Sequence, residues 1–181
     1  MRRIINSTYV TLDGVIQNPQ DWPSLGSFGD EGGQIQNTLL AQCDAVLMGR
    51  RTYEGFAPVW SARSGDPMSD RMNALPKYVV STTLTDPAWH NTTVVHTDPI
   101  EAIRELTQRP GADIVQYGFG PLSHALMAAG LLDELRLWMH PFFVGKGDQL
   151  YQAGSTGSFT LADTQILDSG IVILTYRNPE N

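Results

Sequence analysis

The segment 44–54 limits the possible fold of this chain more than any other stretch. Asp44–Met48 is a short, mostly apolar run, Gly49 interrupts it, and Arg50–Glu54 can continue as a helix. A buried strand that ends at glycine and turns into a helix leaves backbone N–H groups free at the helix start, where they attract anions. Arg50 adds a planar, permanently charged group suited to phosphate. The segment predicts a phosphate-binding strand–turn–helix unit, and a plain turn with solvated arginines is the alternative.

Hydrophobic periodicity and turn residues predict the other elements. We expect strands at 3–11, 44–48, 77–81, 93–96, 113–117, 135–139, 159–167 and 171–177. We expect helices at about 31–42, 51–60, 68–75, 99–110 and 121–129. Asp98, Pro99 and Glu101 predict a capped start for the fourth of these helices, with a capping box. The long connection 12–30 carries Gly, Pro, Asp and Trp, and loops of this length are often functional.

This alternation predicts an α/β fold, a three-layer sandwich with a mostly parallel central sheet, helices on both faces and a C-terminal antiparallel hairpin. The 181 residues suit a single domain, 1–181. Ligands of such sheets bind beyond the carboxyl ends of the strands. Glycine turns lead into helices at two of these ends, at Gly49 and at Gly118–Gly120. The sequence therefore favours an anionic, nucleotide-like ligand.

Composition excludes several classes of function. The net charge of −7 argues against a nucleic-acid partner, because phosphate backbones select clustered Lys and Arg. No apolar run approaches the length of a membrane span, and no secretion signal is recognisable, so we expect a cytoplasmic protein. The single cysteine, Cys43, is expected to be a small buried hydrophobic residue, and no Cys/His cluster has zinc spacing, so no metal site is predicted.

Several motifs keep two readings on local grounds. Gly118-x-Gly120 is followed by Ser123 where a dinucleotide fingerprint needs a third glycine, so it is either a phosphate contact or a simple turn. Ser81-Thr82-Thr83 can cap a turn or accept a phosphate oxygen. Val144–Gly147 is more typical of a loop between edge strands than of a phosphate loop. His140 is expected to be packed or solvated rather than catalytic.

The order of these motifs carries a family resemblance over nearly the whole chain. TLDGVI at 11–16 is followed by MGRRTYE at 48–54, KYVVST at 77–82, GFGPL at 118–122 and GLLDEL at 130–135. This order resembles the dihydrofolate reductase superfamily, and more closely the family of the riboflavin-biosynthesis reductase domain (RibD C-terminal).

The resemblance implies NADPH as the cofactor. Gly49, Arg50 and Thr52 would hold the pyrophosphate and the 2′-phosphate of the adenosine half, with Ser81 and Thr82 beside that phosphate. The turn formed by Gly118, Phe119, Gly120, Pro121 and Leu122 would wrap the pyrophosphate and the nicotinamide side. The loop 12–23 would close over nicotinamide and substrate, which makes its residues Asp13 and Trp22 substrate candidates.

The implied reaction is hydride transfer from NADPH to a small pyrimidine, pterin or related heterocycle. The family-level substrate is 5-amino-6-(5-phosphoribosylamino)uracil. The zinc deaminase signature H-x-E…P-C-x-x-C is absent, so a free-standing domain can have a different substrate. Asp30 is the nearest counterpart of the acidic residue that grips the pterin in folate reductases, and it is our catalytic candidate for proton delivery, with water as the alternative.

Two further functions stay open. The chain could be a true dihydrofolate reductase, although folate reductases carry a Gly-Gly pair where this chain has Gly118-Phe119. It could also bind NADPH or another ligand without turnover, as a sensor. A small-molecule substrate is the expected partner, and a homodimer is a possible assembly.

Overall fold

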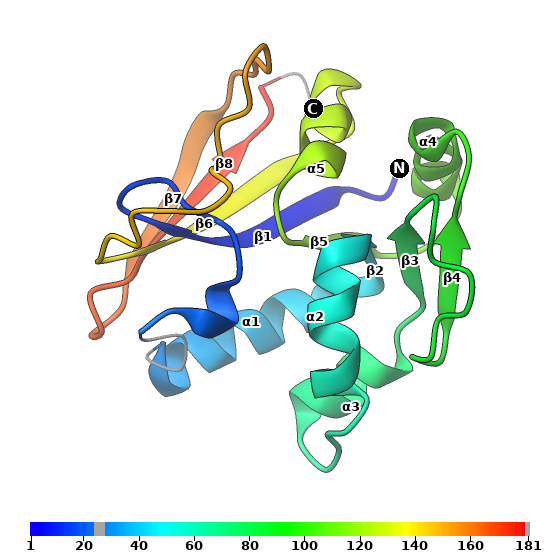
Figure 1. Ribbon diagram of the computed structural model, residues 1–181, viewed down its shortest axis with the longest axis horizontal. Coiled ribbons are helices and arrows are strands. Elements are labelled where there is room, and N and C mark those ends of the chain that lie inside the picture. Colours follow the sequence, from blue (N-terminus) through cyan, green and yellow to red (C-terminus); the bar gives the residue numbers. More distant parts are fainter. Residues whose placement is uncertain (24–27, 180–181) are drawn as a thin grey trace.

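The computed structural model describes residues 1–23 and 28–179, and in this part of the chain eight strands form one sheet (Figure 1). The strands are β1 (Ile4–Thr11), β2 (Cys43–Gly49), β3 (Lys77–Val80), β4 (Thr92–Val95), β5 (Asp113–Tyr117), β6 (Glu134–His140), β7 (Thr160–Ile166) and β8 (Val172–Arg177). The helices are α1 (Gly29–Gln42), α2 (Arg50–Trp60), α3 (Pro67–Ala74), α4 (Pro99–Gln108) and α5 (Pro121–Ala128), preceded by a single 3-10 turn, η1 (Pro19–Asp21).

The strand order is β4-β3-β2-β5-β1-β6-β8-β7. The neighbouring strands β4, β3, β2, β5, β1 and β6 run parallel to one another, whereas β8 runs antiparallel to both β6 and β7. Gly170, with φ +83°, closes the β7–β8 hairpin and donates its N–H to the carbonyl oxygen of Leu167 at 2.8 Å. The predicted mostly parallel sheet with a C-terminal antiparallel hairpin is confirmed.

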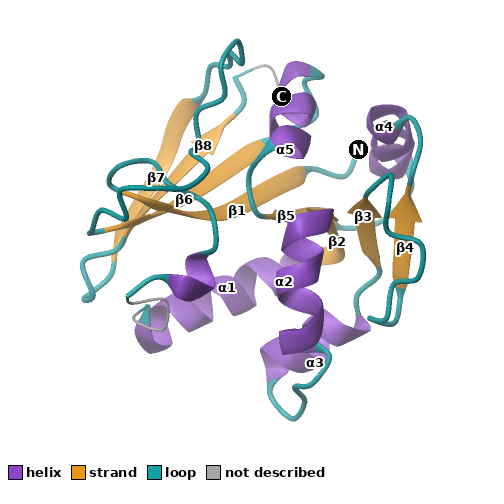
Figure 2. Ribbon diagram, viewed as in Figure 1, coloured by secondary structure: helices purple, strands orange, loops and turns teal. Residues whose placement is uncertain are grey.

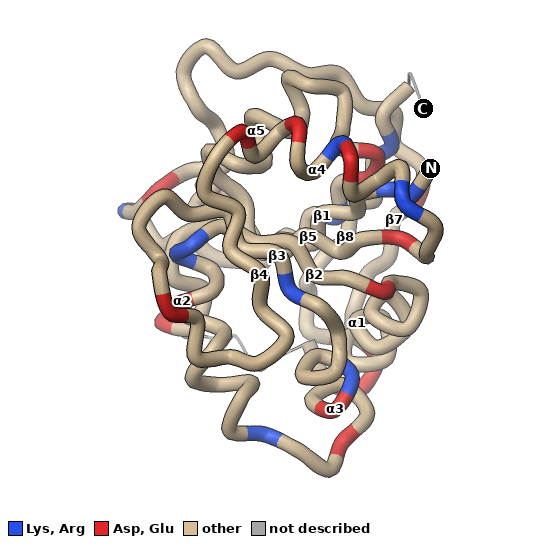
Figure 3. The backbone as a smooth tube through the Cα atoms, turned by 90° about the vertical axis from the view of Figure 1, so that its right-hand side faces the viewer, with Lys and Arg blue, Asp and Glu red and all other residues tan. Residues whose placement is uncertain are grey.

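Helices cover the two faces of the sheet (Figure 2). Viewed from the β3–β4 edge, α4 and α5 lie above the sheet and α1, α2 and α3 lie below it (Figure 3). The lower face buries Ile5, Val46, Met48, Val79 and Val115 against Leu39, Leu40, Tyr53 and Met72 of the three helices. The upper face buries Ile4, Ala45, Leu47 and Ile114 against Ile103, Leu106 and Leu126. Alternate residues of each central strand therefore face opposite layers, as expected for strands buried on both sides.

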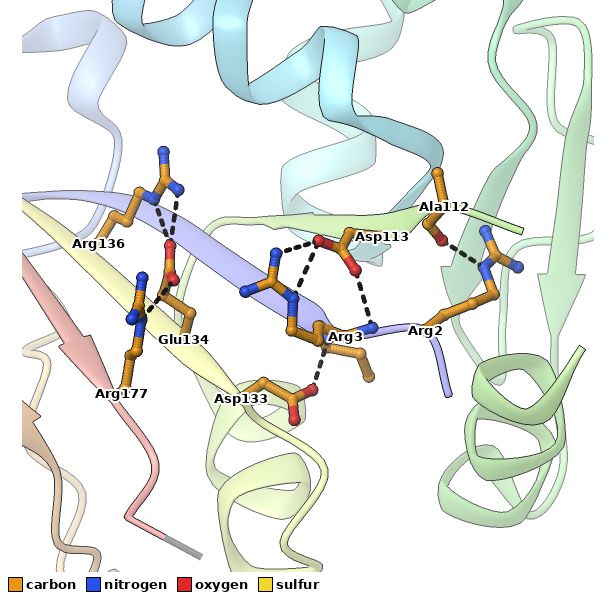
Figure 4. A network of polar contacts seen from close by, with 9 residues as sticks. Arg2, Arg3, Ala112, Asp113, Asp133, Glu134, Arg136 and Arg177 are labelled. Carbon is orange, nitrogen blue, oxygen red and sulfur yellow. Dashed lines mark hydrogen bonds and ion pairs between the residues drawn. The ribbon is translucent and has the colours of Figure 1, made fainter. Parts of the chain in front are cut away.

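Charged side chains tie together the amino-terminal ends of β1, β5 and β6, where these strands begin (Figure 4). Arg3 pairs with Asp113 across the β1–β5 boundary. The Asp133 carboxylate accepts the backbone N–H of Ile4 at 2.7 Å. Glu134 is almost fully buried, and its two carboxylate oxygens pair with Arg136 at 2.7 Å and with Arg177 at 3.3 Å.

The capping box predicted at Asp98 is wrong. Asp98 does precede α4, but it has φ 43° and its side chain makes no cap hydrogen bond. A capping side chain reaches the first-turn N–H groups from an extended backbone, which the left-handed conformation of Asp98 does not provide. Glu101 instead approaches Arg104 at 3.6 Å. A true side-chain cap occurs at α3, where the Asp66 carboxylate accepts the N–H groups of Met68 and Ser69.

Helices long and apolar enough to cross a bilayer are absent from residues 1–23 and 28–179.

Candidate functional site

A cleft of about 1530 Å³ opens at the carboxyl ends of the parallel strands. This volume exceeds the roughly 300–1,000 Å³ of a pocket for one small ligand, so it can hold a cofactor and a substrate together. We call the outer half the part where helices begin, formed by residues 49–52, 80–83, 99–100 and 118–125. We call the inner half the part between the sheet and the lower helices, formed by Ser7, Tyr9, Phe28, Gln36, Phe56, Val59, Trp60, Met68, Met72 and Tyr117.

Three helix starts line the outer half. Helices α2 and α5 begin directly after Gly49 and Gly120, and α4 begins at Pro99. None of these three starts is capped by a side chain, so their first-turn N–H groups are available to a ligand. The positive ends of the three helix dipoles converge there, which favours an anionic ligand.

Arg50 is the first residue of α2, directly after the Gly49 turn, and its side chain reaches the turn that follows β3. Its Nε donates to the Glu54 carboxylate at 2.6 Å and its Nη1 donates to the Thr83 hydroxyl at 2.5 Å. The Ser81 hydroxyl accepts the backbone N–H groups of Thr83 and Leu84 and so fixes the turn after β3. Thr83 was not among the residues assigned to the cofactor, although it belongs to the Ser81-Thr82-Thr83 run that the sequence offered as a possible phosphate contact.

Gly118 lets the β5–α5 turn approach α2 closely. It has φ +76°, and a Cβ at this position would collide with the Thr52 hydroxyl. Its carbonyl oxygen accepts a hydrogen bond from Nδ2 of Asn6 at 2.8 Å, and this bond holds the turn against β1. Phe119, Gly120, Pro121 and Leu122 also line the outer half. The structure thus brings together all ten residues predicted for the cofactor: Gly49, Arg50, Thr52, Ser81, Thr82, Gly118, Phe119, Gly120, Pro121 and Leu122.

Two loops, 12–23 and 142–150, pack against each other and border the cleft; we call them the loop pair. Backbone hydrogen bonds of 2.8–3.0 Å join them, from Leu12 N to Phe142 O, Ile16 N to Asp148 O and Leu150 N to Gly14 O. Ile16–Gln20 from the first loop and Asp148–Gln149 from the second line the cleft. At the rim, Arg51 of α2 pairs with Asp148 at 2.6 Å, an exposed contact between the helix and the loop pair.

Asp13 holds the loop pair together. Its carboxylate accepts the N–H of Gly145 at 2.7 Å and that of Val144 at 3.3 Å. It also accepts a hydrogen bond from the Thr11 hydroxyl. These hydrogen bonds lower the pKa of Asp13, and the one from Thr11 has the largest effect. Asp13 does not line the cleft, so its predicted substrate contact stays a prediction, while its contacts assign it to loop–loop binding.

Trp22 and Asp30 also lie outside the cleft lining. Trp22 is buried within the loop pair, where its Nε1 donates to the carbonyl oxygen of Gln17 at 3.0 Å and its ring contacts His140 and Phe142 edge-on. Asp30 is exposed in the first turn of α1, where a carboxylate suits the helix dipole. The substrate role of Trp22 and the catalytic role of Asp30 stay predictions.

His140 is a packed histidine, one of the two readings kept for it. It is fully buried among Tyr9, Trp22 and Phe142, whose rings it meets edge-on, with ring centroids 5.2–5.7 Å apart. Neither ring nitrogen has a hydrogen-bond partner in the described part of the chain. Burial lowers the pKa of His140 to about 4, so the ring is neutral at physiological pH.

The inner half contains polar groups that the sequence did not reveal. Ser7 and Tyr117 are register partners on β1 and β5, so their side chains share the lower face of the sheet. Gln36 of α1 reaches this floor, with its Nε2 3.5 Å from the Ser7 hydroxyl. Gln36 and Tyr117 are both more than nine-tenths buried, and burial raises the pKa of Tyr117. Single polar residues in apolar patterns give no sequence signal for such a role.

Comparisons with known proteins identify the family of the chain. The family model of the RibD C-terminal domain matches residues 2–173. The uncharacterized protein YyaP of Bacillus subtilis (strain 168) is 29% identical over 189 residues, which cover 97% of this chain and 95% of that protein.

Two solved structures share the fold. A putative riboflavin biosynthesis protein from Shewanella sp. PV-4 is 20% identical, with a TM-score of 0.64 and 98% of each chain covered. A diaminohydroxyphosphoribosylaminopyrimidine deaminase/5-amino-6-(5-phosphoribosylamino)uracil reductase from Thermotoga maritima is 15% identical, with a TM-score of 0.68. The match covers 98% of this chain but 56% of the Thermotoga protein. With its family model matching almost from end to end, the chain belongs to the RibD C-terminal domain family.

Proposed function

We propose that the protein is an NADPH-dependent reductase that transfers hydride to a small heterocyclic molecule. The observation that carries this proposal is the two-part cleft. Uncapped helix starts and Arg50 make the outer half suitable for phosphates, and aromatic and apolar side chains make the adjoining inner half suitable for a planar ring. Membership of the RibD C-terminal family supports a reductase, since one structural relative is named as a uracil-derivative reductase.

The residues of the outer half fit NADPH. Gly49 and Gly120 leave open space where a Cβ would project, so a ligand can approach both helix starts closely. Arg50, held between Glu54 and Thr83, supplies the positive charge that a 2′-phosphate requires. When bound, NADPH supplies the hydride, while the chain binds and orients both partners and excludes water.

Among possible substrates, 5-amino-6-(5-phosphoribosylamino)uracil represents the family, and dihydrofolate is the alternative. The folate alternative has less support, because the acidic residues of α1, Asp30 and Glu31, are exposed and the helix presents the neutral Gln36 to the cleft. Water is the better-supported proton source for the same reason. An Asp30→Asn variant with unchanged turnover and pH dependence would remove Asp30 from the mechanism.

The test is NADPH oxidation, followed at its absorbance band with each candidate substrate and with NADH in parallel. Substrate-dependent oxidation that prefers NADPH supports the proposal. Tight NADPH binding without oxidation for any heterocycle would instead support a ligand-binding protein without turnover. Failure to bind either nucleotide would exclude both.

A further inference from the structure

One wall of the cleft is an irregular segment that is tied down at both of its ends. We call residues 148–155, which lead from the loop pair toward β7, the strap. In Figure 1 the strap passes in front of β6 and rises beside α5. Four of its residues line the cleft: Asp148, Gln149, Tyr151 and Gln152. A ligand in the cleft therefore meets a wall whose position depends on the contacts that hold it.

The first end of the strap is tied to α2 and to the first loop of the loop pair. Asp148 pairs with Arg51 of α2 at 2.6 Å. The backbone N–H of Asp148 donates to Gln17 Oε1 at 2.9 Å, and that of Leu150 donates to the carbonyl oxygen of Gly14 at 2.8 Å. These contacts fix the strap up to Leu150.

The second end of the strap is tied to α5 by one buried side chain. Nδ1 of His124 lies 2.8 Å from the Ser155 hydroxyl, and His124 is 8% exposed. Burial lowers the pKa of His124, and a hydrogen bond with the Leu150 backbone opposes that shift. Just beyond the strap, Gly157 lies so close to Met127 of α5 that a Cβ would collide with the sulfur. His124 thus holds the strap at two points, at Leu150 and at Ser155.

Tyr151 lies between these two points and presents an aromatic side chain to the cleft. It is 71% exposed and lines the cleft, and its side chain makes no hydrogen bond or ring contact with the described residues. A single exposed aromatic side chain is ordinary on a protein surface. This one differs because its backbone is held on both sides at the wall of a ligand-sized cleft, where a flat ring can pack against it.

The order of the strands decides which end of a long ligand the strap meets. Arg50 and Thr83 lie beside the end of β3, whereas the strap is tied to the loop that follows β1. Strands β2 and β5 lie between β3 and β1, so three strand spacings, about 14 Å, separate them. Helices α2 and α5 begin after these two middle strands. A dinucleotide with its 2′-phosphate at Arg50 and its pyrophosphate at the two helix starts therefore brings its nicotinamide toward the strap.

We propose that Tyr151 packs against the nicotinamide ring of the bound dinucleotide, and that His124 is the positioning residue that holds Tyr151 there by fixing the strap to α5. His124 acts through Leu150 and Ser155 rather than on the ligand. The inference rests on the proposed function in taking NADP(H) as the ligand of the outer half.

Two ligands test the contact with Tyr151. NADP⁺ carries the nicotinamide ring, and 2′-phosphoadenosine diphosphate ribose carries the same phosphates without it. Titration calorimetry on the full chain should show that Tyr151→Ala weakens NADP⁺ binding about two- to tenfold and leaves the affinity for the fragment unchanged. Tyr151→Phe keeps the ring and should retain the wild-type affinity. The matched control is Phe143→Ala, because Phe143 is 73% exposed but lies outside the cleft lining.

A second set of variants tests the positioning role of His124. His124→Ala should weaken NADP⁺ binding by the same factor as Tyr151→Ala, and the double variant should be no weaker than Tyr151→Ala alone, because both changes remove one contact. His124→Asn keeps a polar atom near the place of Nδ1 and should restore most of the affinity. Hydrogen exchange of residues 150–157 should become faster in His124→Ala but not in Tyr151→Ala. His90→Ala changes an exposed histidine outside the cleft lining and is the control, and the thermal midpoint checks that each variant is folded.

The inference is overturned if Tyr151→Ala leaves NADP⁺ affinity unchanged, if it weakens NADP⁺ and the fragment equally, or if the losses of the two single variants add in the double variant. Any of these results, with NADP⁺ still bound by the wild-type chain, leaves the proposed reductase standing. The expected pattern of affinities without NADPH oxidation by any heterocycle would reject the reductase and keep the inference.

Discussion

At the scale of single residues, we propose that Arg50 distinguishes NADPH from NADH by contacting the 2′-phosphate. Charge-assisted hydrogen bonds contribute roughly 1.5–3 kcal/mol, which is about ten- to a hundredfold in affinity. Arg50→Ala should weaken NADPH binding by that factor and leave NADH binding nearly unchanged, as measured by calorimetry. Glu54→Gln, which releases Arg50 from its ion pair, should strengthen NADPH binding alone.

The matched control is Arg109→Ala, which removes the same charge from an exposed position outside the cleft lining and should leave both affinities unchanged. A loss that is equal for NADPH and NADH in Arg50→Ala would exclude contact with the 2′-phosphate.

His140 should make the protein sensitive to acid. Its folded pKa of about 4 lies below the ordinary 6.5, so between these values the unfolded chain binds a proton that the folded chain does not. Stability is therefore present above pH 6.5 and is lost as the pH falls toward 4, by about 3 kcal/mol at most. His140→Phe, which suits the surrounding rings, should flatten the decline in urea unfolding free energy between pH 7 and 4.5.

His90→Phe changes an exposed histidine and should leave the slope of that decline as it is in the wild type. An unchanged slope in His140→Phe would show that the buried ring does not titrate in this range.

Site residues differed in how far they could be predicted. Gly49 and Arg50 are adjacent in sequence and mark the end of a strand, so the local pattern was sufficient to place them beside the cleft. Gln36 and Tyr117 look like ordinary members of a buried helix face and a buried strand. Their place in the inner half depends on how α1 and β5 come together around Ser7, and no local pattern records that packing.

At the scale of elements, the loop pair brings two distant segments of the chain to the edge of the cleft. Asp13→Ala removes the acceptor of the Val144 and Gly145 N–H groups and should loosen loop 142–150. Since Asp148 and Gln149 line the cleft, the Kd for NADPH should rise several-fold while the thermal midpoint changes little. Hydrogen exchange of residues 142–150 measures the loosening directly.

Asp21→Ala removes an exposed carboxylate from the same first loop and serves as the control. If Asp13→Ala leaves exchange in 142–150 at the wild-type rate, its carboxylate does not hold the loops together.

Element positions were largely predictable, because hydrophobic periodicity and glycine turns are local. The strand 113–117 matches β5, and the predicted helix 51–60 differs from α2 by one residue at its start. The loop pair was not predictable: its hydrogen bonds join segments about 130 residues apart, such as Gly14 and Leu150. The conformation of Asp98 was also missed, since a capping pattern does not reveal a left-handed backbone.

At the scale of the whole molecule, the layer arrangement followed from the alternation of strands and helices, but the strand order did not. β1 lies between β5 and β6, and β8 rather than β7 joins the parallel strands. This order depends on contacts between distant segments, including Arg3 with Asp113 and Glu134 with Arg177.

Glu134 should contribute to global stability without affecting the cleft. Its side chain is 2% exposed and forms ion pairs with two arginines, Arg136 and Arg177, at the amino-terminal end of β6. Glu134→Gln should lower the unfolding free energy by about 2 kcal/mol, because hydrogen bonds between charged groups are replaced by weaker ones. Urea unfolding measures the loss, and Glu105→Gln, on the exposed side of α4, is the control. NADPH affinity should be unchanged, and a loss of NADPH affinity in Glu134→Gln would show that Glu134 also affects the cleft.

The charged network in Figure 4 lies where β1 and β5 begin, and the cleft lies toward their carboxyl ends. The network residues Arg3 and Asp113 precede the cleft residues Ser7 and Gln116 by four and three residues, or roughly 10–13 Å along a strand, which is about the distance beyond which exposed charges are screened at ordinary salt. Substitutions in the cleft can therefore accumulate without weakening the interactions that order β1, β5 and β6. A chain built this way can change the molecule it recognises while retaining its architecture, so its descendants need not share a substrate.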